Sequence, residues 1–239
     1  MKQRIIFLCI VSLILGSCGD FLEPKSKSEF VPKDASSLSE LLLGEAYPRN
    51  GITELNVKKV YFGQLDPPLI NEGIQQIQNT KKNLINENIS LFYSSDLKRC
   101  TESAKIINES LNLDIIEKEG FRELNFGIFE GISHEELMNK YPEEADIFFK
   151  NWETYRIPGG ESIHDFMMRA VNEIEEIKKA YKGEIILITT HSGVIQAVLS
   201  YYFTGDLDAY WKFRFNHGSM TKLCFDSSDF AFLEYVNRI

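Results

Sequence analysis

The chain has 239 residues, of which 44% are hydrophobic and 26% are charged, a composition typical of a globular protein with a full core. Its formal net charge of −9 argues against a nucleic-acid-binding surface, so an anionic ligand would depend on individual arginines. The four cysteines have no C-x-x-C spacing, and the four histidines are scattered without a metal-binding motif. We therefore expect no metal and no other cofactor.

The first eighteen residues are typical of an export signal. Lys2 and Arg4 precede an apolar run from Ile5 to Leu15 that is too short to anchor the chain across a bilayer. The run ends in "LGSC", which resembles a bacterial lipobox. We predict a signal peptide at residues 1–17 and lipidation of Cys18, which would export the protein and anchor it to the outer membrane or within the periplasm. The alternative interpretation of the apolar run is a buried strand or helix.

Residues 18–48 predict a polar tether, rich in Ser, Lys and Pro, followed by a short helix from about Ser36. The stretch from Cys18 through "DFLEPKSKSEFVPK" to "LLLGEAYPR" resembles the mature N-terminus of SusD/RagB-type glycan-binding lipoproteins of the outer membrane. That resemblance covers about the first fifth of the chain, and nothing after Arg49 continues it.

From Ile52 onward, hydrophobic spacing predicts alternating helices and strands. In chain order we expect a helix at 69–85, a strand at 89–95, a helix at 96–113 capped by Asp96, one or two helices at 132–152 broken near Pro142, a helix at 161–181, a strand at 184–190, a helix at 192–203 and terminal strands at 220–226 and 230–236. The apolar strand "EIILITT" is typical of a parallel sheet buried on both faces. The order predicts a three-layer α/β/α sandwich with a mainly parallel central sheet.

Three polar residues lie at positions where such a fold commonly places its binding and catalytic side chains. His191 ends the strand at 184–190 just before a helix, a favourable place for a phosphate. Arg99 lies one turn into the helix after Ser94 and Ser95, where it could clamp a phosphoryl group, and Glu123 could protonate a leaving oxygen. Taken singly, each has a plainer interpretation: a capping or core histidine, a solvated arginine and a surface glutamate.

The same stretches occur together in one family. Residues from about 51 to 239 resemble the histidine phosphatase superfamily, which has a phosphoglycerate-mutase-like fold. The motifs "FGQLDPPL", "SSDLKR", "RELNFGIFEG", "NWETYRIPGGES" and "THSGVI" look most like the α-ribazole phosphatases of cobalamin synthesis. The resemblance covers about four-fifths of the chain and implies a phosphomonoester hydrolase.

The resemblance also implies roles for single residues. Arg49, Arg99, His191 and Asn56 would hold the phosphate, and Glu123 would donate the proton to the leaving group. The family's nucleophile is the histidine of an Arg-His-Gly signature, and this chain has Asn50 at that position. An amide nitrogen has no usable lone pair, so Asn50 cannot accept a phosphoryl group.

A second departure lies just before the signature. The family enters it from a central strand, but here the preceding residues are "LLLGEAYP", and Pro48 cannot donate to a central ladder. We therefore expect the first central strand to be degraded. The hypothesis is a fusion near residue 50, with a signal peptide at 1–17, a SusD-like tether and short helix at 18–48 and a phosphatase-like domain at 49–239.

Three functions follow from these patterns. The first is a lipid-anchored phosphomonoesterase for a small phosphorylated molecule such as α-ribazole phosphate. The second is an inactive phosphate-binding or vestigial fusion protein. The third, suggested by the leader alone, is a glycan-binding lipoprotein. Because cobalamin synthesis is an internal process, an exported protein favours either another substrate or no turnover.

Overall fold

The computed structural model describes residues 4–9 and 53–239. Its sheet has six strands in the order β3-β2-β4-β1-β5-β6. Their bounds are β1 Arg4–Cys9, β2 Leu91–Ser94, β3 Ile115–Glu117, β4 Ile185–Thr189, β5 Met220–Phe225 and β6 Ala231–Arg238. The first four in that spatial order run parallel, whereas β5 is antiparallel to both β1 and β6.

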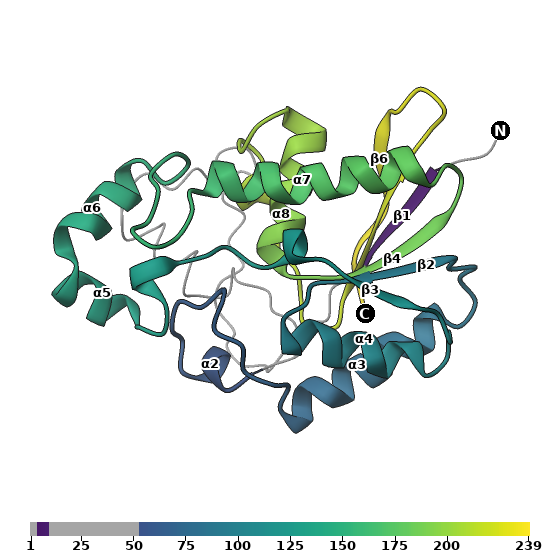
Figure 1. Cartoon of the computed structure of the whole chain (residues 1–239), viewed down its shortest axis with the longest axis horizontal. Helices are drawn as coiled ribbons and strands as arrows, with labels where there is room; N and C mark the ends of the chain where they lie inside the picture. Colours follow the sequence, from purple (N-terminus) through teal and green to yellow (C-terminus); the bar gives the residue numbers. More distant parts are fainter. Residues whose placement is uncertain (1–3, 10–52) are drawn as a thin grey trace, which may run out of the picture.

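The helices connect these strands and extend beyond them (Figure 1). They are α2 Glu54–Val57, α3 Asn71–Leu84, α4 Lys98–Asn108, α5 His134–Lys140, α6 Pro142–Lys150, α7 Ile163–Ala180 and α8 Ser192–Thr204, with short 3₁₀ turns η1 Glu119–Phe121, η2 Gly127–Phe129 and η3 Tyr210–Lys212. Within the described ranges, no helix is both long enough and apolar enough to cross a bilayer.

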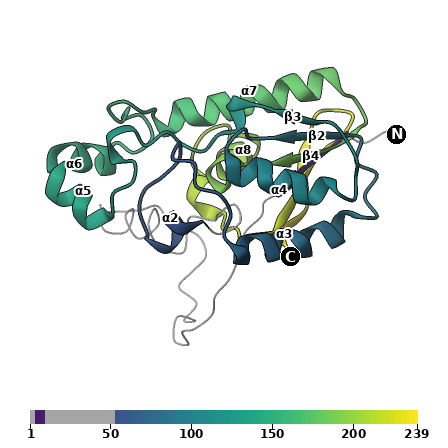
Figure 2. The same ribbon diagram turned by 60° about the horizontal axis from the view of Figure 1, so that its bottom comes forward.

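Helices cover both faces of the sheet (Figures 1 and 2). α3 and α4 lie on one face, and α7 and α8 lie on the other. Ile186 and Ile188 of β4 join the core under α7 and α8, whereas Leu187 between them joins the core under α3 and α4. β4 is therefore buried on both faces, and the predicted three-layer α/β/α sandwich with a mainly parallel sheet is confirmed.

Two predicted helix boundaries have different outcomes. The break near Pro142 is confirmed, because α6 begins at that residue, where a proline costs no helical hydrogen bond. The prediction that Asp96 caps the next helix is wrong: Leu97 is the N-cap residue of α4. The carboxylate of Asp96 instead accepts two hydrogen bonds from Arg122, at 2.7 and 2.6 Å.

β1 fills the centre of the sheet. It pairs parallel with β4 from Ile5 to Cys9 and antiparallel with β5 from Arg4 to Cys9. We expected a degraded strand here; instead, six residues of the predicted signal peptide form a paired one, and their β-branched Ile5 and Ile6 suit a strand. The segment "LLLGEAYP" lies outside the described residues.

α5 and α6 form a separate lobe beyond one end of the sheet (Figures 1 and 2). Aromatic contacts run through this lobe and its connections: the Phe148 ring lies 5.9 Å from that of Phe129 and 5.5 Å from that of Phe149, and the Trp152 ring lies 5.4 Å from that of Trp211. The lobe is therefore anchored to the body by buried rings.

Candidate active site

His191 lies at the carboxyl end of β4 and is the N-cap residue of α8. The apolar strand carries the chain through the core and ends at this polar residue, which is 1% exposed. Its Nε2 lies 2.9 Å from Oγ of Ser95, which follows the neighbouring strand β2. The ends of two parallel strands therefore meet at His191, the place predicted for a phosphate.

Arg99 extends from α4 toward the same point and is 2% exposed. Its Nε donates to Nδ1 of His191 over 3.3 Å, and its Nη1 and Nη2 donate to the carbonyl oxygens of Leu65 and Gly63 at 2.9 and 2.7 Å. Its guanidinium carbon lies 5.3 Å from the centre of the Phe62 ring. The plainer interpretation of Arg99 as a solvated surface arginine is therefore wrong.

The contacts of His191 define its tautomer. Arginine N–H groups can only donate, so Nδ1 of His191 is the acceptor and Nε2 carries the proton that is donated to Ser95. Burial, with a smaller effect from the charges of Arg99 and Arg169, holds the pKa of His191 well below its ordinary value. His191 is therefore a neutral imidazole whose one N–H group is donated to Ser95; a bound anion would take the place of that hydroxyl as the acceptor.

The loop at 63–65 is held between two opposite charges. The carboxylate of Glu130 accepts hydrogen bonds from the backbone N–H groups of Gly63, Gln64 and Leu65 at 2.9, 2.9 and 3.3 Å. Arg99 donates hydrogen bonds to two backbone carbonyl oxygens of the same loop. Because the loop orients the guanidinium, Glu130 supports the site indirectly. The sequence contained both motifs, "FGQLDPPL" and "RELNFGIFEG", but no spacing rule links their residues.

Glu123 reaches the first turn of α8. It is 4% exposed, and its carboxylate accepts hydrogen bonds from the backbone N–H groups of Leu124 at 2.9 Å and Gly193 at 3.2 Å. Burial raises the pKa of Glu123, although these bonds and the charges of Arg99 and Arg169 act in the opposite direction. A raised pKa suits a general acid, so the surface interpretation of Glu123 is also wrong.

Gly193 allows this approach because it has no side chain. A Cβ atom at that position would lie 2.2 Å from Oε1 of Glu123. The absence of a side chain thus brings the candidate acid to the helix turn that begins immediately after His191.

Cys100 adds a buried thiol to the cluster. Its Sγ lies 3.4 Å from Nε2 of His191, and burial raises the pKa of the thiol to about 12. Cys100 therefore stays protonated at neutral pH and packs as a small apolar group. Cys100 and Cys224 are both free, buried thiols.

The other predicted site residues have different outcomes. Asn56 belongs to α2, where its Oδ1 accepts from N and Oγ1 of Thr53 at 2.9 and 3.0 Å. Within residues 53–239 it makes no hydrogen bond to Arg99, Glu123 or His191, so its observed role is to cap a helix. Arg49, Asn50 and Cys18 lie outside the described residues. The structure thus brings together Arg99, Glu123 and His191.

The motif "RIPGGES" does more than form a turn. Ser162 caps α7, since its Oγ accepts from the backbone N–H of Asp165 at 3.1 Å. Glu161, the residue before this cap, pairs with Arg169 at 2.7 Å. Elsewhere in the described part of the chain, no group of three or more His, Cys, Asp or Glu could hold a metal ion.

Comparisons with known proteins show what the chain is similar to. A family model described as the histidine phosphatase superfamily, branch 1, matches residues 48–238. Phosphoserine phosphatase 1 of Hydrogenobacter thermophilus is 30% identical over 171 residues, which span 72% of this chain and 81% of that protein. The adenosylcobalamin/alpha-ribazole phosphatase of Escherichia coli is 25% identical over 189 residues, 79% of this chain and 93% of that protein.

A solved structure gives the same result. The alpha-ribazole phosphatase from Shigella flexneri aligns with a TM-score of 0.73 at 27% identity, covering 79% of this chain and 93% of the solved chain. The predicted resemblance, including its α-ribazole phosphatase relatives, is confirmed.

Proposed function

Because the chain belongs to the histidine phosphatase superfamily, we propose that it binds and hydrolyses phosphomonoesters of small molecules. The observation that carries this proposal is the convergence of Arg99, His191 and Glu123 at the carboxyl ends of β2 and β4. A guanidinium and a neutral imidazole N–H suit a phosphate dianion, and a buried carboxyl with a raised pKa suits proton donation to the leaving oxygen.

The chemistry is adapted to the residue at position 50. Asn50 cannot form a phosphoenzyme, so we propose direct attack by water. A bond forms between the water oxygen and phosphorus as the ester P–O bond breaks, and Glu123 gives its proton to the leaving oxygen. One proton of the attacking water then passes to the Glu123 carboxylate, which restores the acid and leaves the alcohol and hydrogen phosphate as products. Arg99 and His191 hold the non-bridging oxygens during transfer. Positioning and charge stabilisation without covalent catalysis give a slow enzyme.

Two substrates are proposed first. α-Ribazole phosphate is favoured by the five motifs and by relatives named as alpha-ribazole phosphatases. Phosphoserine is favoured by the relative named phosphoserine phosphatase 1. As the alternative to residues 4–9 serving as β1, we propose export through residues 1–17 with lipidation at Cys18. An exported enzyme would meet phosphoserine or another external phosphomonoester rather than a cobalamin precursor.

A second candidate function rests on one observation, the asparagine at position 50. In this alternative the chain binds phosphate esters through Arg99 and His191 without turning them over. It makes the same prediction as the first candidate for binding and the opposite prediction for hydrolysis.

The experiment that separates them compares the parent chain with Asn50→His. Release of phosphate from p-nitrophenyl phosphate, α-ribazole phosphate and phosphoserine is measured beside binding of orthovanadate. Turnover by the parent that is lost in Glu123→Gln supports the hydrolase. Turnover by Asn50→His, with none by the parent while the parent still binds orthovanadate, supports the binding protein. Absence of both turnover and vanadate binding in both proteins would refute the two candidates together.

A further inference from the structure

The segment that carries Glu123 has little regular structure of its own. η1 covers only Glu119–Phe121, and the chain from Arg122 to Asn125 has neither helix nor strand. A general acid must nevertheless be fixed closely to its substrate, since small misplacements cost large factors in rate. Some other part of the molecule therefore has to hold this segment in place.

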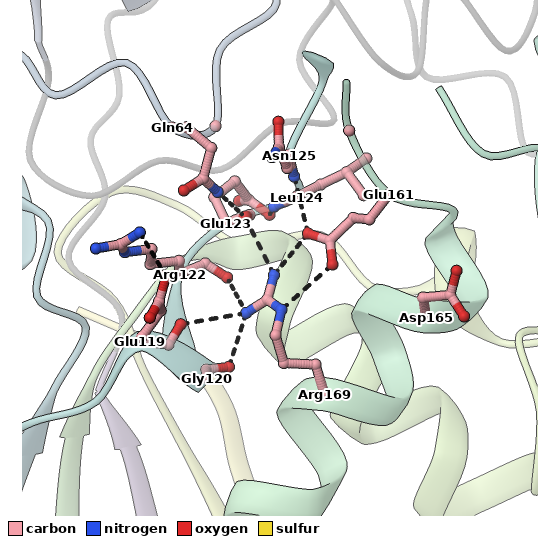
Figure 3. A network of polar contacts seen from close by, with 12 residues as sticks. Gln64, Glu119, Gly120, Arg122, Glu123, Leu124, Asn125, Glu161, Asp165 and Arg169 are labelled. Carbon is pink, nitrogen blue, oxygen red and sulfur yellow. Dashed lines mark hydrogen bonds and ion pairs between the residues drawn. The ribbon is translucent and has the colours of Figure 1, made fainter. Parts of the chain in front are cut away.

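One side chain of α7 does so (Figure 3). Arg169 donates through Nη1 to the backbone carbonyl oxygens of Gly120 and Arg122 at 2.9 and 3.0 Å, with a longer contact of 3.4 Å to Glu119. Its Nη2 lies 3.4 Å from the carbonyl oxygen of Glu123 itself. A single guanidinium thus contacts four carbonyl oxygens of the acid-bearing segment.

Glu161 closes the arrangement from the other side. Its carboxylate accepts from Nη2 of Arg169 at 2.7 Å and from Nε at 3.3 Å, and Oε1 also accepts from the backbone N–H of Asn125 at 2.9 Å (Figure 3). The backbone N–H of Glu161 donates to the carbonyl oxygen of Asn125 at 3.1 Å. The backbone carbonyls of Gly120 and Arg122, before Glu123, thus bind the Arg169 guanidinium. The backbone N–H of Asn125, after Glu123, binds the Glu161 carboxylate.

We propose that Arg169 is a positioning residue for Glu123, acting through the backbone of residues 119–125 together with its ion-pair partner Glu161. This inference deepens the proposed function and rests on it. Contacts from the opposite side complete the support, because Gln64 Nε2 donates to the carbonyl oxygen of Glu123 at 2.8 Å and Thr190 Oγ1 donates to that of Phe121 at 2.9 Å.

The charge of Arg169 also affects the pKa of Glu123, in addition to positioning its backbone. The cations facing the Glu123 carboxyl are Arg99 from α4 and Arg169 from α7, and both lower its pKa against the effect of burial. Both also lower the pKa of the neighbouring His191. Removal of the Arg169 charge should therefore move the alkaline limb of kcat, on which the acid must be protonated, to higher pH.

The test uses Arg169→Lys, Arg169→Gln and the control Arg156→Gln. Arg156 is an exposed arginine in the irregular segment before α7, and it pairs with Asp165 of that helix at 2.6 Å. In whichever of the parent and Asn50→His turns over, we expect Arg169→Gln to lower kcat about 10- to 100-fold with KM changed less than about threefold, and to shift the alkaline limb upward. Arg169→Lys should lower kcat but leave the alkaline limb of kcat at the parental pH, because lysine retains the positive charge and lacks the planar set of guanidinium N–H donors.

Hydrogen exchange makes the inference independent of turnover. Arg169→Gln and Arg169→Lys should speed exchange of the Leu124 and Asn125 amides, whereas Arg156→Gln should not. If neither background hydrolyses any ester, the proposed hydrolysis fails while this readout still tests the positioning. The inference is overturned if the Arg169 variants match Arg156→Gln in exchange, or if they lower kcat without any change of the pH limb in Arg169→Gln.

Discussion

Nε of Arg99 donates a hydrogen bond to Nδ1 of His191 across 3.3 Å, in the interior of the protein. A buried cation and a histidine coexist there because the imidazole is neutral and offers its lone pair to the guanidinium. The contact orients both groups before a phosphate arrives, which lowers the cost of binding. It also determines how the protein should respond to acid.

The first prediction concerns His191 and pH. Its pKa is lowered on folding, so below its ordinary pKa of about 6.5 the unfolded chain binds a proton that the folded chain excludes. This contribution to stability is complete above that pH and is lost as the pH falls, at up to about 1.4 kcal/mol per pH unit. We expect His191→Gln to flatten the fall in unfolding free energy between pH 7 and pH 5.

Urea unfolding of the parent, His191→Gln and His164→Gln at several pH values checks this. His164 is exposed on α7 and serves as the control, which should keep the parental slope. Comparison between variants is required because Glu123, with its raised pKa, acts in the opposite direction: its protonation favours the folded state as the pH falls. An unchanged slope in His191→Gln would contradict the assignment of a buried neutral imidazole.

The second prediction concerns Arg99. Arg99→Gln leaves the carbonyl oxygens of Gly63 and Leu65 without a charged donor, so we expect a loss of about 2–4 kcal/mol in the free energy of unfolding. Orthovanadate binding should weaken at least about tenfold. Lys98→Gln removes the exposed cation next to it in α4 and should change neither quantity. Equal vanadate affinity in the two variants would show that the phosphate lies elsewhere.

Much of this fold could be predicted from the sequence. The strands β2 and β4 and the helices α3, α7 and α8 have strong local hydrophobic patterns, and Pro142 marks a helix start by its own chemistry. β1 was only the alternative interpretation of its segment, a buried strand or helix, because the run after Arg4 suits both a signal peptide and a strand. Its partners in β4 and β5 lie far along the chain, and nothing local identifies them.

The site residues likewise divide into those that the sequence could predict and those that it could not. Arg99 and His191 were predictable because they follow parallel strands, whose carboxyl ends share one edge of the sheet. Arg169 was missed because an arginine on an amphipathic helix usually faces solvent, and its partners are backbone carbonyls, which have no sequence signature. Asn56 was assigned to the phosphate by resemblance, although the spacing from Thr53 to Asn56 already fits a capping arrangement.

The third prediction uses Gly193. In Gly193→Ala the new methyl group would lie 2.2 Å from Oε1 of Glu123, so the carboxylate has to move. We expect a loss of about 1–3 kcal/mol in stability and a fall in kcat. The matched control is Glu123→Ala, which removes the obstructed group. In a double-mutant cycle the cost of Gly193→Ala should largely disappear in that background, and an unchanged cost would place the clash with another neighbour.

The fourth prediction concerns β1 and the two roles available to residues 4–9. Cleavage before Cys18 would remove a strand that pairs with both β4 and β5. All residues of β5 and most of β4 are buried, so the separated edges would leave unpaired backbone groups in the interior. Export of the chain as a lipoprotein and completion of this sheet by β1 therefore exclude each other in one molecule.

We expect the free energy of unfolding of a chain that starts at Cys18 to be lower by several kcal/mol, on the order of the whole stability of a domain, unless another segment pairs with β4 and β5 in place of β1. Urea unfolding of the full chain and the shortened chain measures the difference. The control replaces Ile6 in the full chain by Pro, which removes a backbone donor from β1 at the position paired with Ile186 and Leu223. A shortened chain and an Ile6→Pro variant that both unfold like the parent would show that β1 does not complete the sheet in solution, leaving residues 1–17 free to act as the export signal.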